Sequence, residues 1–395
     1  MRGANSAAVL QLLRRHDSMS RADLARRSGL TEGSVSRIIS GLIKRKLVRE
    51  DGAENSTGGR PGTRLRLDEY RIGIGAEIRR SESKMAAVTL SGNVIYSLSF
   101  PTPATPDETL DLLIEKFYEF RKRYGLSRIE GLGVSVRGIV NGTTGIVELG
   151  NLPFWVGVPV KETLGEALKL AAEVDNNVRL AAIAEYNYGT LLEVRNSKSL
   201  LFAMVDEGFG TGLVLEGKLY CGAGYAAGEF GQMVIRDTGG SAKLDAAGCL
   251  ESLASSRALC ERYAAARSKR GLAAGKDSRS RASRICHLAL AGEKEALEVL
   301  AETCRYLGIG IANIAWGFNP DSVVIDSVLN ESWSLTAPLI REQFPKEKEI
   351  VNFRNLVLRP SSLGGQASII GAATMPFQGI FTTGELNNDM QTHTK

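Results

Sequence analysis

Two helix-start signals and one helix-end signal follow one another between residues 20 and 48. Ser20 and Thr31 are residue types that favour helix N-termini, and Gly29 readily takes the left-handed conformation that ends a helix. The pattern predicts two short helices joined by a tight turn, preceded by another helix with Val9, Leu12 and Leu13 on one face. The apolar residues of the last helix also recur at helical spacing: Val35, Ile38, Ile39 and Leu42.

The opposite face of that last predicted helix carries short polar side chains and one arginine, including Ser34, Ser36 and Arg37. Short side chains allow a helix to approach base edges in the major groove. Predicted strands at 47–50 and 65–67 flank a glycine-rich tip, which suggests a wing that reaches a minor groove. We therefore predict a winged helix-turn-helix over residues 1–68. Its expected DNA contacts are Thr31, Ser34, Ser36, Arg37, Arg60 and Pro61.

Positive charge is concentrated in the same region. Residues 1–66 hold 14 Lys or Arg and 6 Asp or Glu, a net charge of +8, whereas the whole chain of 395 residues carries +5. Phosphate contacts require such a local excess of basic side chains. The alternative is a small protein-interaction domain with a solvated basic face.

Other features of the sequence exclude several classes of protein. No apolar run reaches the roughly 18 residues that a membrane helix needs. The first 20 residues lack a signal-peptide core, and the five cysteines have no paired spacing. We expect a cytoplasmic protein with no membrane partner and no disulfide framework.

From residue 72 the pattern changes to that of an α/β body. Three strand-like runs predict an antiparallel meander, which helices and a buried strand follow, and the same order then begins again. Such a repeat predicts two similar α/β lobes, at 69–190 and 191–395, with a cleft between them and a C-terminal helix able to return to the first lobe. The expected strands are 72–78, 85–90, 94–100, 129–136, 200–205 and 213–215, and the expected helices are 107–124, 161–172 and 177–189.

Seven short motifs, in this order and spacing, resemble the winged-helix repressor branch of the ROK family (repressors, open reading frames and sugar kinases). The resemblance covers nearly the whole chain and implies an actin-like, ribonuclease-H-like sugar-kinase fold of two lobes. The motifs lie at 20–48, 59–61, 132–138, 151–155, 175–182, 208–212 and 227–232.

The chain departs from the kinases of that family at catalytic positions. The resemblance implies that these kinases carry an Asn-Asp pair whose Asp accepts the sugar hydroxyl proton. This chain has Asn176-Asn177 at the matching positions. An amide cannot accept that proton, and Asp175 lies two positions earlier, where its side chain is expected to point elsewhere. The family's first phosphate loop, Asp-x-Gly-Gly-Thr, is also missing at 73–80. Glycines at 208, 210 and 212 remain, either as an anion-binding turn or as a tight turn between strands. We expect no enzyme activity and no catalytic residue.

The family resemblance also implies a metal site and a ligand site. The structural zinc of many members corresponds here to Gln232, Ala242, Leu244 and Cys249, which leaves one thiolate, so we expect no metal and no cofactor. The sugar-binding positions carry amides and carboxylates, which pair well with hydroxyl groups. The implied ligand contacts are Asn151, Asn176, Asn177, Glu229, Gln232 and Glu251.

Together these points predict a repressor of carbohydrate-utilisation genes that senses a sugar without phosphorylating it. Its expected partners are a double-stranded DNA operator, a small-molecule sugar effector, and further copies of the chain in a homodimer or dimer of dimers. Two alternatives stay open. One is a ROK sugar kinase with a fused DNA-binding domain, and the other is a regulator with a ligand-dead cleft controlled by a protein partner.

Overall fold

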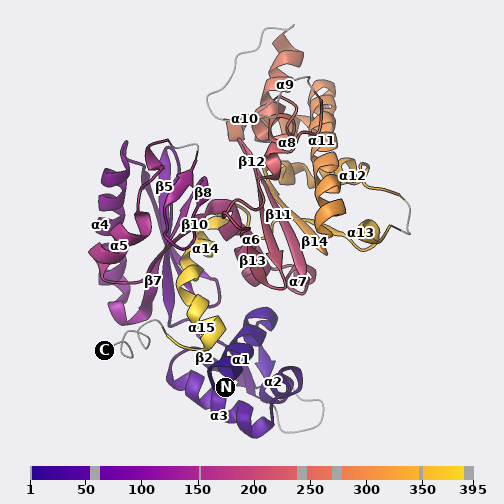
Figure 1. Cartoon of the computed structure of the whole chain (residues 1–395). Helices are drawn as coiled ribbons and strands as arrows, with labels where there is room; N and C mark the ends of the chain where they lie inside the picture. Colours follow the sequence, from indigo (N-terminus) through magenta and orange to yellow (C-terminus); the bar gives the residue numbers. More distant parts are fainter. Residues whose placement is uncertain are drawn as a thin grey trace. The chain divides into compact units, whose positions relative to one another are not determined.

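The computed structural model describes residues 2–53, 63–150, 153–237, 247–268, 278–346 and 350–386. The chain forms two compact units, each with its own five-stranded sheet (Figure 1). The first unit is Met1–Tyr188 with Gln366–Lys395, and the second is Gly189–Gly365. The C-terminal helices therefore belong to the unit that contains the N-terminus. Within the described residues, no helix is long and apolar enough to cross a membrane.

The N-terminal region is a helix-turn-helix with a small three-stranded sheet. The Ser20 hydroxyl accepts a hydrogen bond from the backbone of Asp23, and Thr31 accepts one from Ser34, so both helices begin where the sequence predicts. Gly29 ends the first of them at φ 71°, in the left-handed region, as expected. The elements are α1 (Arg2–His16), β1 (Met19–Ser20), α2 (Arg21–Ser28), α3 (Glu32–Lys44), β2 (Val48–Ala53) and β3 (Thr63–Leu67).

The sheet of the first unit has the order β10-β7-β4-β5-β6. The predicted meander is confirmed, since β4, β5 and β6 pair antiparallel, whereas β7 and β10 join in parallel. The strands are β4 (Ile72–Glu77), β5 (Glu82–Thr89), β6 (Val94–Pro101), β7 (Ile129–Val136) and β10 (Ala172–Asn176), with a β8 (Ile139–Val140) and β9 (Val147–Leu149) ribbon beside them.

Successive residues of each strand point to opposite faces of this sheet, and different helices cover the two faces. Ile72 and Ile74 point into an apolar core with α4 and α5. Gly73 and Gly133 lie on the other face against α14, whose backbone comes so close that a Cβ on either glycine would lie 1.8 Å from a carbonyl oxygen. The helices are α4 (Pro106–Tyr124), α5 (Val160–Leu168), α6 (Asn177–Tyr188), α14 (Ala367–Thr374) and α15 (Gln378–Thr383).

The second unit repeats this strand arrangement, in the order β13-β12-β11-β14-β15. Again the first three strands pair antiparallel and the last two join in parallel, which confirms the predicted repeat. The elements are α7 (Leu192–Arg195), β11 (Ser199–Val205), β12 (Phe209–Leu215), β13 (Lys218–Tyr220), α8 (Leu250–Ala254), α9 (Ser256–Ser268), α10 (Ser278–Leu290), α11 (Lys294–Phe318), β14 (Ser322–Ser327), α12 (Trp333–Arg341), α13 (Val351–Arg354) and β15 (Val357–Pro360).

Two local predictions were wrong. The helix expected over 161–172 ends at Leu168, because Lys169 takes the left-handed conformation, and the chain then forms β10 against the exposed edge of β7. The glycine-rich segment is not a loop throughout, since Gly210 and Gly212 lie inside β12. Strand pairing with β11 overrides the local preference of glycine for turns there.

Candidate DNA-binding surface and ligand site

The solvent face of α3 carries the polar side chains predicted to contact DNA. Ser36 and Arg37 are exposed and Ser34 is partly exposed, while the apolar residues of α3 pack into the core of the helix-turn-helix. The Thr31 hydroxyl donates to the Ser34 hydroxyl at 2.9 Å, so Thr31 also fixes the start of the helix. The structure therefore presents short hydroxyl side chains beside Arg37 on the solvent face of this helix. The predicted wing residues Arg60 and Pro61 lie outside the described residues.

The helix-turn-helix shares its apolar core with the C-terminal end of the chain. Phe377, Ile380, Phe381 and Leu386 are buried in the same cluster as the core residues of α1, α2 and α3. Arg45, at the end of α3, donates to the carbonyl oxygen of Gly384 at 2.5 Å. This contact was not predicted from the sequence, where its only local signal is a run of apolar residues near the C-terminus.

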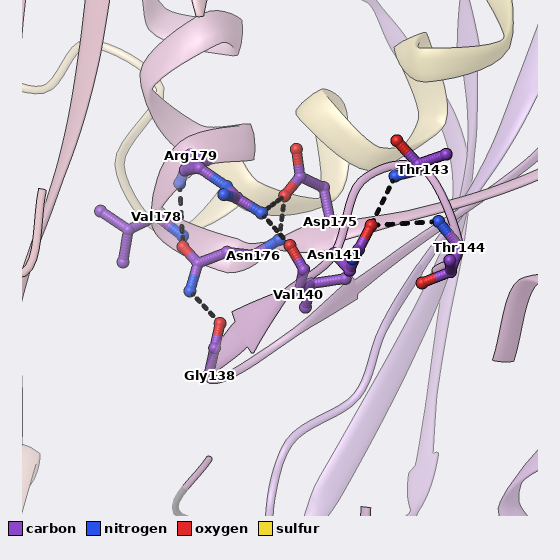
Figure 2. Close-up of polar contacts among 9 residues, drawn as sticks. All are labelled: Gly138, Val140, Asn141, Thr143, Thr144, Asp175, Asn176, Val178 and Arg179. Carbon is purple, nitrogen blue, oxygen red and sulfur yellow. Dashed lines mark hydrogen bonds and ion pairs between the residues drawn. The ribbon is translucent and has the colours of Figure 1, made fainter. Parts of the chain in front are cut away.

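In the first unit, Asn176 sits where β10 turns into α6 (Figure 2). Its side-chain oxygen accepts backbone hydrogen bonds from Val178 at 2.8 Å and from Arg179 at 3.1 Å, which starts the helix. Its amide nitrogen donates to the carbonyl oxygen of Gly138 at 2.7 Å. Asn176 thus joins the end of β10 to the segment after β7, and one amide N–H beyond these contacts is what it offers a ligand.

Asp175 forms a buried ion pair with Arg179, one helical turn later (Figure 2). The Arg179 guanidinium also donates to the carbonyl oxygen of Val140 at 2.7 Å. Burial raises the pKa of the Asp175 carboxyl, and the positive charge of Arg179 opposes that rise. A carboxylate held in this way is turned toward the protein interior, so it does not replace the missing base. Asn177, which the family resemblance aligns with the kinase base, is the buried first residue of α6.

Glu77 occupies the end of β4, where the family resemblance placed the first phosphate loop. It lies opposite Ser135 in the parallel β4–β7 pairing and is 5% exposed. Its carboxylate is 2.8 Å from the guanidinium of Arg79. A carboxylate at this position repels a phosphate group, and Arg79 is already paired with it. The absence of the loop was expected from the sequence, whereas the pairing of Glu77 with Arg79 was not.

In the second unit, Glu251 covers the start of β12. Its carboxylate accepts a hydrogen bond from the backbone of Phe209 at 2.8 Å. It lies so close to Gly208 that a Cβ there would be 2.8 Å from a carboxylate oxygen. The glycine-rich segment at 208–212 is a candidate for anion binding, but the backbone amide of Phe209 within it already donates to the Glu251 carboxylate.

Glu229 precedes a short 3-10 turn, η3 (Phe230–Gln232), that ends at Gln232 and packs against both β12 and α8. The Thr211 hydroxyl of β12 donates to the carbonyl oxygen of Gly228 at 2.6 Å and holds this turn in place. The second unit thus gathers Glu229, Gln232 and Glu251 around the start of β12. Asn176 and Asn177 belong to the first unit, and Asn151 lies outside the described residues.

The positions that correspond to the family's zinc ligands are only partly described. Cys249 is 1% exposed, and its sulfur accepts a hydrogen bond from the backbone of Ser252 at the start of α8. Ala242 and Leu244 lie outside the described residues. Among all the residues that the structure describes, no group of three or more His, Cys, Asp or Glu side chains could hold a metal ion.

Two family models match the chain. The ROK family model covers residues 73–378, and the model of the IclR helix-turn-helix domain covers residues 4–52. Together they account for both the N-terminal region and the repeated α/β body.

Curated relatives match over most of their length. The xylose repressor of Bacillus spizizenii is 27% identical over 380 residues, which cover 94% of each chain. The DNA-binding transcriptional dual regulator NagC of Escherichia coli K12 is 28% identical over 350 residues, covering 85% of this chain and 83% of NagC.

Solved structures of ROK proteins, both a regulator and a kinase, are also similar to the chain. A ROK family transcriptional regulator, a homologue of the E. coli MLC protein, superimposes with a TM-score of 0.80 and 25% identity over 97% of each chain. The ROK hexokinase from Thermus thermophilus gives a TM-score of 0.63 and 25% identity over 76% of this chain and 96% of its own. The similarity to the regulator is therefore more extensive along this chain than the similarity to the kinase.

Proposed function

The chain belongs to the ROK family, and we propose that it is a transcriptional repressor of carbohydrate-utilisation genes whose activity depends on a bound sugar. The observation that carries this proposal is the match to repressors over nearly the whole chain, including the helix-turn-helix. DNA binding is assigned to the N-terminal region and sugar binding to the ROK body.

The DNA-binding assignment is supported by the surface of α3 and by charge. Ser36 and Arg37 face solvent, so a major groove can accept α3 without a change in its packing. The net charge of +8 in residues 1–66 supplies phosphate contacts, so operator binding should weaken steeply with salt. A homodimer or dimer of dimers would place two such helices on a palindromic operator.

The ligand assignment is supported by the amides and carboxylates at the six candidate positions. Xylose and N-acetylglucosamine are the first sugars to test, because repressors named for them are among the relatives. Glu229 and Glu251 offer carboxylate acceptors for hydroxyl hydrogens, and Gln232 offers both a donor and an acceptor. Asn176 and Asn177 offer amide groups at the start of α6.

We assign no kinase activity to this body, although kinases share its fold. Asn177 stands at the position of the base, and Asp175 is paired with Arg179. Glu77 and Glu251 place carboxylates beside the two segments that would otherwise receive phosphate groups. Restoring the base with Asn177→Asp should therefore leave ATP-dependent sugar phosphorylation undetectable, because the phosphate segments remain altered.

The experiment that tests the proposal is a thermal-shift screen of the full chain against pentoses, hexoses, N-acetylated sugars, sugar phosphates and ATP. A rise in Tm with one sugar class and none with ATP supports a sugar-responsive regulator. A rise with ATP, followed by measurable sugar phosphorylation, would instead establish a kinase. No response to any sugar would favour control by a protein partner.

A further inference from the structure

A short ribbon follows β7, close to the candidate ligand residues of the first unit. It consists of β8, with two residues, and β9, with three. The two strands pair with each other and belong to neither five-stranded sheet. A two-stranded ribbon is at best marginally stable by itself. The position of the β8–β9 ribbon therefore depends on its contacts with the rest of the unit.

The ribbon leads directly into Asn151, one of the candidate ligand residues. Gly138 precedes the ribbon at φ 118°, and Leu149 and Gly150 follow at its other end. These two ends touch, because a Cβ on Gly138 would lie 2.1 Å from the Leu149 carbonyl oxygen and 2.8 Å from the Gly150 Cα. Asn151 itself lies outside the described residues. The position of the ribbon thus sets the point at which the chain enters Asn151.

Two side chains at the start of α6 hold this region (Figure 2). Asn176 donates to the carbonyl oxygen of Gly138 at 2.7 Å, just before the ribbon. Arg179 donates to the carbonyl oxygen of Val140 at 2.7 Å, within β8. In the proposed function Asn176 must also serve a ligand, whereas Arg179 is 2% exposed and serves the protein alone. The bond from Arg179 is therefore the contact given over entirely to the ribbon.

The Arg179 guanidinium occupies a place where a positive charge is unfavourable. It belongs to the first turn of α6, where a cation opposes the helix dipole, and that turn carries no acidic residue. The buried Asp175 carboxylate balances the charge and also accepts a hydrogen bond from the Asn176 backbone at 2.6 Å. Residues that break a local preference in this way are expected at functional sites. The bond to Val140 supplies such a function.

We propose that Arg179 is a positioning residue of the sugar site, which holds the β8–β9 ribbon against the start of α6 and so fixes the point at which the chain enters Asn151. This inference rests on the proposed function, because it assumes that a sugar engages both Asn151 and Asn176. A sugar held by amides from both segments loses affinity when the ribbon shifts, since hydrogen bonds weaken steeply with distance and angle.

The test is Arg179→Met, which keeps an unbranched side chain and removes the donors. Sugar Kd is measured by calorimetry on the full chain, with each sugar that raises the wild-type Tm, beginning with xylose and N-acetylglucosamine. The Kd should rise by about 10- to 100-fold, the range found for residues that orient the ligands of metal sites. Arg179→Lys, which keeps a charged donor, should give a smaller rise.

Arg71 offers a matched control in the same unit. Its guanidinium pairs with the Glu130 carboxylate at 2.7 Å and donates to the carbonyl oxygen of Ser127 at 3.1 Å. These contacts lie at the amino ends of β4 and β7, whereas Asn176 lies at the carboxyl end of β10, which runs parallel to β7. Arg71→Met should therefore lower the midpoint of unfolding in urea and leave the sugar Kd unchanged.

A double variant separates positioning from stability. Arg179→Met alone leaves the Asp175 carboxylate buried without its partner, so weaker sugar binding would also follow from partial unfolding. Asp175→Asn combined with Arg179→Met removes both charges, and the amide oxygen can still accept from the Asn176 backbone. Its urea midpoint should return toward the wild-type value, because neutral side chains often replace a buried ion pair without loss of stability. Its sugar Kd should stay raised, because the bond to Val140 is still missing.

Hydrogen exchange tests the hold on the ribbon without a ligand. Peptides from 139–149 should exchange faster in Arg179→Met and in the double variant, but not in Arg71→Met. Wild-type exchange in the double variant would overturn the inference, because the ribbon would then keep its position without Arg179.

The outcomes separate this inference from the proposed function. If the wild-type protein binds a sugar and the double variant binds it with the same Kd, the inference is wrong and the proposed function stands. If Arg71→Met raises the sugar Kd as much as Arg179→Met does, the effect is one of stability and the inference is also wrong. If the wild-type protein binds no sugar, the sugar-dependent part of the proposed function fails and the inference fails with it.

Discussion

Phe381 offers a direct way to measure how strongly the C-terminal helix supports the DNA-binding region. Its ring is 3% exposed and belongs to the apolar cluster formed by α1, α2, α3 and α15. The Arg14 guanidinium lies 4.0 Å from the ring centre. The substitution Phe381→Ala removes the ring and leaves the backbone contacts of α15, such as its hydrogen bond from Gln11, in place.

The expected loss is large for one side chain. Truncating a buried Phe to Ala costs about 3–5 kcal/mol, and loss of the cation–π contact with the partly buried Arg14 adds about 0.5–2 kcal/mol. Because domain stabilities are only about 5–15 kcal/mol, the DNA-binding region should open locally far more often. Each 1.4 kcal/mol changes an equilibrium about tenfold, so a loss of even 3 kcal/mol should speed amide exchange in α1 about 100-fold.

Hydrogen exchange followed by mass spectrometry measures this effect by segment. Peptides from α1 and α3 should exchange much faster in Phe381→Ala, whereas peptides from α11 in the second unit should not change. Phe353→Ala, which removes a partly buried ring packed against the apolar core of the second unit, is the control and should leave α1 unaffected. Unchanged exchange in α1 of Phe381→Ala would refute the conclusion that α15 completes the core of the helix-turn-helix.

Three further predictions concern single side chains. Asp175→Asn leaves the buried charge of Arg179 without its carboxylate, so the free energy of unfolding in urea should fall by about 3–5 kcal/mol, and a loss below about 1 kcal/mol would contradict the ion pair's assigned role. Arg37→Ala should weaken operator binding at constant salt by about 1–3 kcal/mol and relax sequence preference, whereas equal weakening on random DNA would assign Arg37 to phosphate contact alone. Burial raises the pKa of Cys304 to about 12, so a thiol reagent at pH 8 should label the partly exposed Cys221 first, and equally fast labelling of Cys304 would be inconsistent with its burial.

Features that depend on neighbours in the sequence could be predicted well. The starts of α2 and α3 follow from Ser20 and Thr31, because a side chain that caps a helix acts within three residues. The two-fold repeat of strands and helices was also readable, since each strand carries its own apolar pattern. The domain limits, the oligomer and the roles of the candidate site residues stay predictions.

Features that depend on distant parts of the chain could not be predicted. The contact of α1 with Phe381 joins segments more than 360 residues apart in the sequence. No local pattern in either segment indicates that it contacts the other. β10 was not predicted, apart from Ala172 at the end of an expected helix, because the segment is short and its strand character comes from pairing with β7. The Asp175–Arg179 pair was within reach, however, since the two residues are four apart at the start of a predicted helix.

The measurement that tests the central claim most directly is operator binding as a function of sugar concentration. A labelled genomic fragment that the full protein binds near physiological salt would be titrated with xylose and with N-acetylglucosamine. The account predicts specific, salt-sensitive binding that one sugar class reverses, with no change on adding ATP and no phosphorylated sugar formed. Sequence-independent binding, or conversion of the sugar to its phosphate in the presence of ATP, would contradict it.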